Sequence, residues 1–255
     1  MKNYKVHNKL IHELKGIWVI AKKDIHIYYL KAPVLIFGIV FPCFLFLAFA
    51  FGREVDPASL IPGLIGMTLF FTASSVGPII FPWETRGKTL ERLVSCPVSI
   101  QSILLGDVLA GFLFGIGISL VPFLLGILGL GMNVDNYLIL ILAILLSALC
   151  FSSLGVLLSS PPTDNPSNVM MLSNLVRLPL IFISGIFIPI DQLPTGGQIT
   201  SLFSPLSYTT DLLRHTLQGS HCYPIALDLL LLLVFTGVFL TFGIGLHKMS
   251  LAKRI

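Results

Sequence analysis

The stretch Tyr137–Leu158 reads YLILILAILLSALCFSSLGVLL and contains no Asp, Glu, Lys or Arg. An apolar helix of roughly 20 residues is long enough to cross the hydrocarbon core of a bilayer. Five other stretches have the same character: Val34–Phe51, Leu60–Pro82, Val108–Leu130, Val169–Pro189 and Ile225–Leu246, the last two interrupted only by Arg177 and Asp228. The sequence therefore predicts six membrane-spanning helices, and an even number places both termini on one side of the membrane.

The composition fits this fold class. Hydrophobic residues make up 55% of the 255 residues and charged residues 11%, which leaves too little polar surface to cover a water-soluble protein of this length. We therefore predict an all-α integral membrane protein with one domain, residues 1–255. Its parts would be a cytoplasmic interfacial helix (1–33), six spans (34–246) and a cytoplasmic tail (247–255).

Basic residues gather on one side of this predicted topology. Thirteen of the 16 lie in the N-terminal segment, the loop between the second and third spans, and the C-terminal tail: Lys2, Lys5, Lys9, Lys15, Lys22, Lys23, Lys31, Arg86, Lys88, Arg92, Lys248, Lys253 and Arg254. Only Arg53 and Arg214 fall on the other side. Because Lys and Arg are retained in the cytoplasm, we expect a multi-pass protein of the cell membrane with both termini cytoplasmic. The net charge of +4 then reflects topology, and nucleic-acid binding has little support.

The N-terminal segment has the pattern of an amphipathic helix. Apolar residues recur at intervals of three and four: Leu10, Leu14, Ile17, Trp18, Ala21, Ile25, Tyr28 and Tyr29, while Lys15, Lys22, Lys23 and Asp24 fill other faces. Such a helix lies at the cytoplasmic membrane interface, with its lysines near anionic lipid headgroups. Two interpretations stay open: a solvated anchor, or a helix whose polar face also contacts a cytoplasmic partner.

The loop Trp83–Asp107 is the most distinctive cytoplasmic segment. A short helix can begin at Thr89–Leu93 and end at Pro97, and Ser99 or Ser102 can cap the third span. A short charged helix placed there could receive a push from a soluble protein and pass it to two spanning helices. The alternative is an ordinary loop that follows the positive-inside rule.

The segment Pro189–Pro224 precedes the last span and is too apolar for a disordered tether. Two short helices fit, Gly197–Phe203 and Tyr208–Leu217, separated by a break at Ser204-Pro205. Neither is long enough to cross a bilayer. We expect a re-entrant helix pair that dips into the outer leaflet and returns.

These segments together resemble the type-2 ATP-binding-cassette (ABC-2) exporter permeases. The residues that carry the resemblance are Glu84, Gly87-Lys88-Thr89-Leu90-Glu91, Pro97-Val98-Ser99, Ser184-Gly185-Ile186-Phe187-Ile188-Pro189, Leu193-Pro194, Ser204-Pro205-Leu206-Ser207-Tyr208, Asp211 and Arg214. The resemblance covers nearly the whole chain. It implies a permease subunit of an ATP-driven exporter that moves an amphipathic or hydrophobic substrate, such as a drug or lipid, out of the cytoplasm.

The resemblance also implies partners and site residues. The loop around Glu84–Pro97 would be the coupling helix that contacts a separate ABC ATPase, with Glu84, Arg86, Lys88, Glu91 and Arg92 at the contact. A second permease copy or a homologue would pair with this chain around a central substrate path. The first and fifth helices would line that path, with these candidate residues: Phe37, Phe41, Phe44, Met170, Asn174, Arg177 and Phe182.

An ATPase site of its own is not expected. Gly87-Lys88-Thr89 matches only the end of the phosphate-binding motif Gly-x-x-x-x-Gly-Lys-Ser/Thr, and Pro82 stands where the first glycine belongs. The six histidines do not form a convincing metal site, and no nucleophile, base and acid stand out. We expect no catalytic residue, metal or cofactor on this chain, with ATP and Mg used by the partner. The rival class is an ATP-independent secondary carrier or lipid scramblase, although no internal repeat supports a carrier.

Three ionisable residues lie at or near membrane depth. Arg177 could bind an anionic headgroup or substrate, or it could pair with Asp107 or a backbone carbonyl and serve structure. Asp107 and Asp228 lie near the predicted starts of helices, where a carboxylate favours the positive end of the helix dipole. We therefore expect both to cap helices. Glycines such as Gly111 and Gly115 indicate close helix packing.

Overall fold

The computed structural model describes residues 2–28, 36–51, 57–96, 98–163 and 165–251, and this part of the chain is helical without a strand. The elements in chain order are α1 (Lys2–Tyr28), η1 (Ile36–Val40), α3 (Phe41–Phe51), α4 (Pro57–Ser74), α5 (Val76–Arg86), α6 (Thr89–Ser95), α7 (Ile100–Leu124), η2 (Leu125–Gly129), α8 (Tyr137–Leu158), α9 (Pro166–Ile183), η3 (Ile190–Gln192), α10 (Thr195–Ser201), α11 (Pro205–Gln218) and α12 (Ile225–Leu251). The all-α class is confirmed. Pro97, the predicted stop of the short cytoplasmic helix, lies outside the described residues.

Within those ranges, five helices are long and apolar enough to cross a membrane: Ala58–Arg86, Ile100–Gly129, Tyr137–Leu158, Pro166–Ile183 and Ile225–Ser250. They correspond to the second through sixth predicted spans. The first predicted span is described only over η1 and α3, which together are shorter than the others. The count of six spans therefore stays a prediction.

Side-chain caps fix where several helices begin. The hydroxyl of Ser99 accepts a hydrogen bond from the Ser102 amide at the start of α7, and Asn136 accepts two at the start of α8. Asn165 does the same before α9, where Pro166 occupies the first turn. These residues satisfy amide groups that a helix start leaves without partners.

The start of α7 corrects one prediction. Because α7 begins at Ile100, Asp107 lies two turns inside the helix and does not cap it. The cap is Ser99, one of the two predicted residues. Asp228 lies in the first turn of α12, where we expected it.

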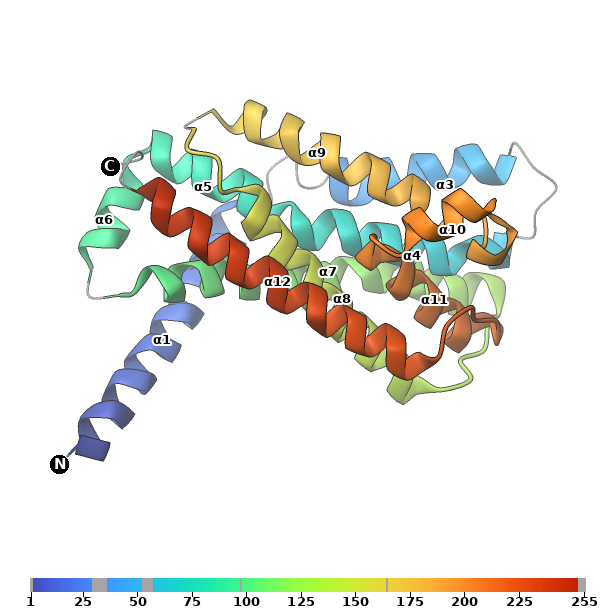
Figure 1. Ribbon diagram of the computed structural model, residues 1–255, viewed down its shortest axis with the longest axis horizontal. Coiled ribbons are helices and arrows are strands. Elements are labelled where there is room, and N and C mark those ends of the chain that lie inside the picture. The colour runs from blue at the N-terminus through green and yellow to red at the C-terminus, as the bar shows by residue number, and fades with distance from the viewer. Residues whose placement is uncertain (1, 29–35, 52–56, 97, 164, 252–255) are drawn as a thin grey trace.

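The long helices pack around α8, which contacts α4, α5, α7, α11 and α12. The aromatic ring of Phe70 packs edge to face against Phe151 and Phe71, with centroid distances of 5.0 Å to Phe151 and 5.9 Å to Phe71. Figure 1 shows α6 and the C-terminal end of α12 at one end of the molecule, with α10 and α11 toward the other. The loop that holds α6 and the segment that holds α10 and α11 therefore lie at opposite ends of the bundle.

The second predicted span is interrupted within its length. It is divided at the single residue Ser75 into α4 and α5, although the backbone of Ser75 stays in the right-handed helical region. Pro78 explains the break, because it has no amide hydrogen to donate to the carbonyl of Ser74, four residues earlier. Neighbouring helices lie tight against this point. A Cβ atom on Gly155 of α8 would lie 2.6 Å from the Ser74 oxygen, and one on Gly111 of α7 would lie 2.7 Å from the Ala73 oxygen.

Candidate functional site

The short helix α6 presents charge on one side and is anchored on the other. Leu90 is buried and packs in a cluster with Phe81, Leu104, Val108 and Val156 from α5, α7 and α8. The predicted contact residues Arg86, Lys88, Glu91 and Arg92 are all exposed. A protein that binds these charged groups would therefore act on a helix that is fixed to the body of the bundle.

The connection between α5 and α6 is short. α5 continues to Arg86, and Lys88 turns the chain with a left-handed backbone conformation (φ 53°). The hydroxyl of Thr89 donates to the Glu84 carbonyl at 3.3 Å. Movement of α6 is thus passed to α5 through very few rotatable bonds.

The N-terminal helix α1 holds both ends of this segment. Lys23 donates a hydrogen bond to Glu84 on α5, before α6. The hydroxyl of Ser99, after α6, donates to Glu13 Oε2 at 2.9 Å, and Ser102 donates to the same oxygen. Residues 84–102 are thereby braced from one side by a single helix.

Glu84 differs from the other four predicted contact residues. It is 2% exposed, and its carboxylate faces Lys23 in the interior of this chain. Lys23 also lies 2.9 Å from Asp24 Oδ1. Burial opposes a charge on Lys23, but the nearby carboxylates of Asp24, Glu84 and Asp107 outweigh it and raise the pKa of the ammonium above its usual range. Lys23 is therefore positively charged in the folded protein.

Sequence reasoning assigned Lys23 and Asp24 to the polar faces of α1, and the structure places them against the bundle. Asp24 is fully buried, next to the buried residues Ile20 and Ala21 on the same face of the helix. A helical spacing of three and four residues from these apolar positions was the signal that could have found it. Glu13 carried no comparable signal.

Arg177 is enclosed in the bundle and donates hydrogen bonds at the break between α4 and α5. It is fully buried, and its guanidinium donates to the Ser74 carbonyl and, at 3.4 Å, to the Ser75 hydroxyl. Pro78 leaves that carbonyl without its helical donor, so Arg177 supplies the missing hydrogen bond. Of the two interpretations from the sequence, contact with a backbone carbonyl is the one seen. Asp107 lies instead with Asp24.

The other predicted substrate-path residues do not share one surface with Arg177. Phe44 and Phe182 are 68% and 60% exposed. Phe41 packs edge to face on Phe71 at 5.1 Å, and Met170 packs against a cluster of buried residues from α1, α5 and α7. Asn174 is half-buried, and the Phe37 side chain lies outside what the structure describes. A role in transport stays a prediction for all seven.

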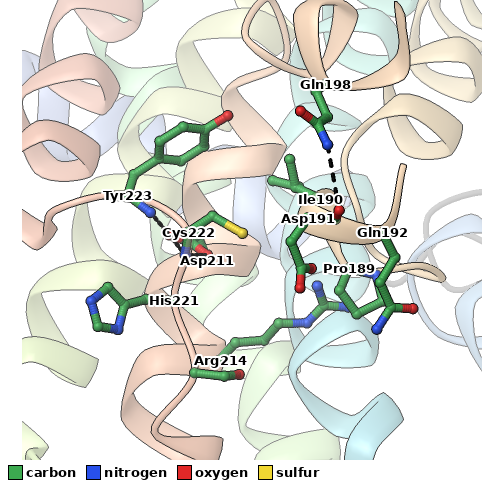
Figure 2. A pocket seen from close by; sticks show the side chains of 11 residues that line it. Pro189, Ile190, Asp191, Gln192, Gln198, Asp211, Arg214, His221, Cys222 and Tyr223 are labelled. Carbon is green, nitrogen blue, oxygen red and sulfur yellow. Dashed lines mark hydrogen bonds between the residues drawn. The ribbon is translucent and has the colours of Figure 1, made fainter. Parts of the chain in front are cut away.

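A cavity of about 570 Å³ lies at the end of the bundle opposite α6. Figure 2 shows Asp191 and Arg214 pointing toward each other across it. Asp211 also lines the cavity, and its carboxylate accepts the amides of Cys222 and Tyr223 at 2.8 and 2.9 Å and so holds the loop before α12.

Arg214 lines both this cavity and a second one of about 480 Å³. It is 8% exposed and donates to the Ile186 carbonyl at 3.3 Å. Burial lowers the pKa of the Arg214 guanidinium, and the charges of Asp211 and Asp191 oppose that shift. Nowhere in the described ranges do three His, Cys, Asp or Glu side chains gather as a metal site.

Comparison with known proteins places these features in a family. The family model for ABC-2 type transporters matches residues 15–217. Nodulation protein J of Rhizobium leguminosarum bv. viciae is 28% identical over 157 residues, which cover 58% of this chain and 57% of that protein. The inner membrane transport permease YadH of Escherichia coli (strain K12) is 24% identical over 180 residues, 71% of this chain and 70% of YadH. The chain thus spans less than two thirds of the nodulation protein, but the family match includes both the α6 segment and most of the α10–α11 segment. This chain belongs to the ABC-2 type transporter family.

Proposed function

We propose that this chain is the membrane-spanning permease subunit of an ATP-driven exporter. A separate ABC ATPase hydrolyses ATP with Mg, and this chain moves an amphipathic or hydrophobic substrate out of the cytoplasm. Membership of the ABC-2 type transporter family supports a transport role. The single observation that carries the ATPase contact is α6: four exposed charged residues surround a helix whose Leu90 is buried in the bundle.

The proposed ATPase drives transport through α6. ATP binding and hydrolysis change the shape of the ATPase, and differential contact with those two states supplies the work. Because Leu90 and the short connections join α6 to α5 and α7, displacement of α6 moves both helices. Cytoplasmic termini follow from this orientation, and the name of YadH, an inner membrane permease, supports a location in the plasma membrane.

A second copy or a homologue completes the permease in this proposal. Helix α9 exposes large apolar side chains, among them Met171, Leu175 and Phe182. Phe44 of α3 is exposed as well. In a dimer these helices would face the partner and border the substrate path, while lipid would cover the exposed side of α12.

Charge reversal on α6 tests the proposed coupling. We expect Glu91→Lys or Arg92→Glu, in permease reconstituted with its ATPase, to lower substrate transport per ATP hydrolysed by at least tenfold. The reversed side chain would lose its ion pair with the ATPase and would repel the charge that it faces there. Both side chains are exposed, so the thermal unfolding midpoint of the permease should stay unchanged. Asp135→Lys, an exposed carboxylate on the connection between η2 and α8, is the matched control. Normal coupling in both α6 variants would contradict the proposal.

The rival function is ATP-independent transport by a secondary carrier or scramblase. Family membership favours the ATP-driven function. Purified permease alone in vesicles separates the two, since a carrier or scramblase moves its substrate without an ATPase. Transport by the permease alone, with no gain on adding ATPase and ATP, would establish the rival.

A further inference from the structure

A buried cluster of three carboxyl groups and one ammonium group joins α1 to α5 and α7. Its members are Lys23 and Asp24 of α1, Glu84 of α5 and Asp107 of α7. Asp24, Glu84 and Asp107 are 0, 2 and 1% exposed. Four ionised groups would give this enclosed site two uncompensated negative charges, which is strongly unfavourable away from water.

The pairing within the cluster leaves Asp107 without a counter-ion of its own. The Lys23 ammonium contacts Glu84 and Asp24. Neither oxygen of Asp107 receives a hydrogen bond from the described residues, and Asp24 lies against it within hydrogen-bonding reach. The charged groups that face Asp107 are Asp24 and Lys23 from α1 and Glu84 from α5. Two ionised carboxylates can only accept hydrogen bonds, so Asp24 and Asp107 would repel each other.

One proton resolves this conflict. A protonated carboxyl donates to the neighbouring carboxylate, so the pair is held by a hydrogen bond and one of the excess charges disappears. We propose that Asp24 and Asp107 share one proton at neutral pH and that this proton fastens the N-terminal helix to α7. Loss of the proton releases α1 from the bundle beside the α6 segment. The inference goes beyond the proposed function and does not depend on an ATPase.

The proposal predicts how stability depends on pH. A carboxyl that holds a proton in the folded state but ionises freely in the unfolded state stabilises the fold at low pH, and this contribution is lost as the pH rises through the folded-state pKa. We expect the thermal unfolding midpoint of the wild-type permease to fall as the pH rises, by roughly 3–5 °C per pH unit over the range in which the folded pair keeps a proton that the unfolded carboxyl has released.

Asp107→Asn is the decisive variant. Its amide donates to Asp24 at every pH, as the protonated carboxyl does, so its midpoint should stay nearly constant where the wild type declines. Asp135→Asn, an exposed carboxylate elsewhere, should follow the wild type. Equal slopes for the wild type and Asp107→Asn would overturn the proposal, as would a wild-type gain at pH 9 on adding Na⁺ or K⁺, which would identify a bound cation in place of the proton.

Two further measurements test the proposal independently if Asp107→Asn folds poorly. Asp24→Asn removes the same repulsion from the α1 side and should give the same flat profile. Hydrogen exchange of α1 amides, compared at pH 9 between the wild type and Asp24→Asn, should be faster in the wild type because its helix is released. Equal exchange in both proteins would contradict release of α1.

Discussion

At the scale of single residues, Arg177 shows how a charge can be kept inside a membrane bundle. It is fully buried, and none of the carboxylates in the described part of the chain lies within 4.0 Å of it. Its hydrogen bonds go to Ser74 and Ser75, at the place where Pro78 interrupts the backbone ladder. The guanidinium therefore acts as a clamp on the α4–α5 break, which is a structural use of a residue type that often marks a transport pathway.

Replacing Arg177 tests this clamp. We expect Arg177→Met to lower the free energy of unfolding by about 1–3 kcal/mol, because the buried Ser74 carbonyl loses its donor. The thermal unfolding midpoint should then fall by roughly 2–4 °C per kcal/mol. Arg92→Met, at an exposed arginine, is the control and should leave the free energy of unfolding unchanged. A fully stable Arg177→Met protein that no longer transports would instead support binding of an anionic headgroup or substrate.

At the scale of elements, much of the helical pattern could be predicted from the sequence. Apolar runs give five spans directly. The α6 helix was predicted from the pattern that begins at Thr89, and the Ser99 cap of α7 from the serines after Pro97. The break in the second span was missed because its residues are apolar on both sides, so the run reads as continuous. Burial of Asp24 and Glu84 was missed for another reason: which polar residues turn inward depends on contacts between α1 and α5, which are far apart in the sequence.

The α4–α5 break also depends on glycine. Gly155 of α8 passes so close to α4 that a Cβ atom would lie 2.6 Å from the Ser74 oxygen and 3.0 Å from the Ser74 Cα. These are backbone atoms at the centre of the bundle and cannot move aside cheaply. In lipid, where close packing replaces the hydrophobic effect between helices, such an approach is a main source of stability.

A single methyl group should reveal this packing. We expect Gly155→Ala to lower the free energy of unfolding by about 1–3 kcal/mol, as overpacking of a dense core does. Gly117→Ala on α7 is the control, because a Cβ atom there meets nothing within 4 Å. It should be neutral or slightly stabilising. Denaturant titration of both variants in the same detergent compares them, and equal stability would show that α8 can shift away from the break.

At the scale of the whole molecule, the two ends of the bundle differ in structure. One end carries α6 braced by α1 and the charge cluster, and the opposite end carries α10, α11 and the cavity beside Arg214 (Figure 1). The long helices α7, α8 and α12 run between them. A displacement of α6 at one end can reach the α11 end only through the packed helices between them, which include α5 and α4 as well, because α6 and α11 lie at opposite ends of the bundle.

The apolar side of α9 gives the last prediction, which concerns the proposed pairing of two copies. Leu175 on α9 is 69% exposed and Leu233 on α12 is 51% exposed. If both leucines faced only lipid, cysteines at the two positions would behave alike in a cross-linking experiment. If α9 faces the partner, Leu175→Cys in a variant with its four native cysteines replaced by serine should form a disulfide-linked dimer in native membranes. Leu233→Cys is the matched control and should stay monomeric on a non-reducing gel. Cross-linking at Leu233 and none at Leu175 would place the partner on α12, since a symmetric pair brings like residues together only near its axis.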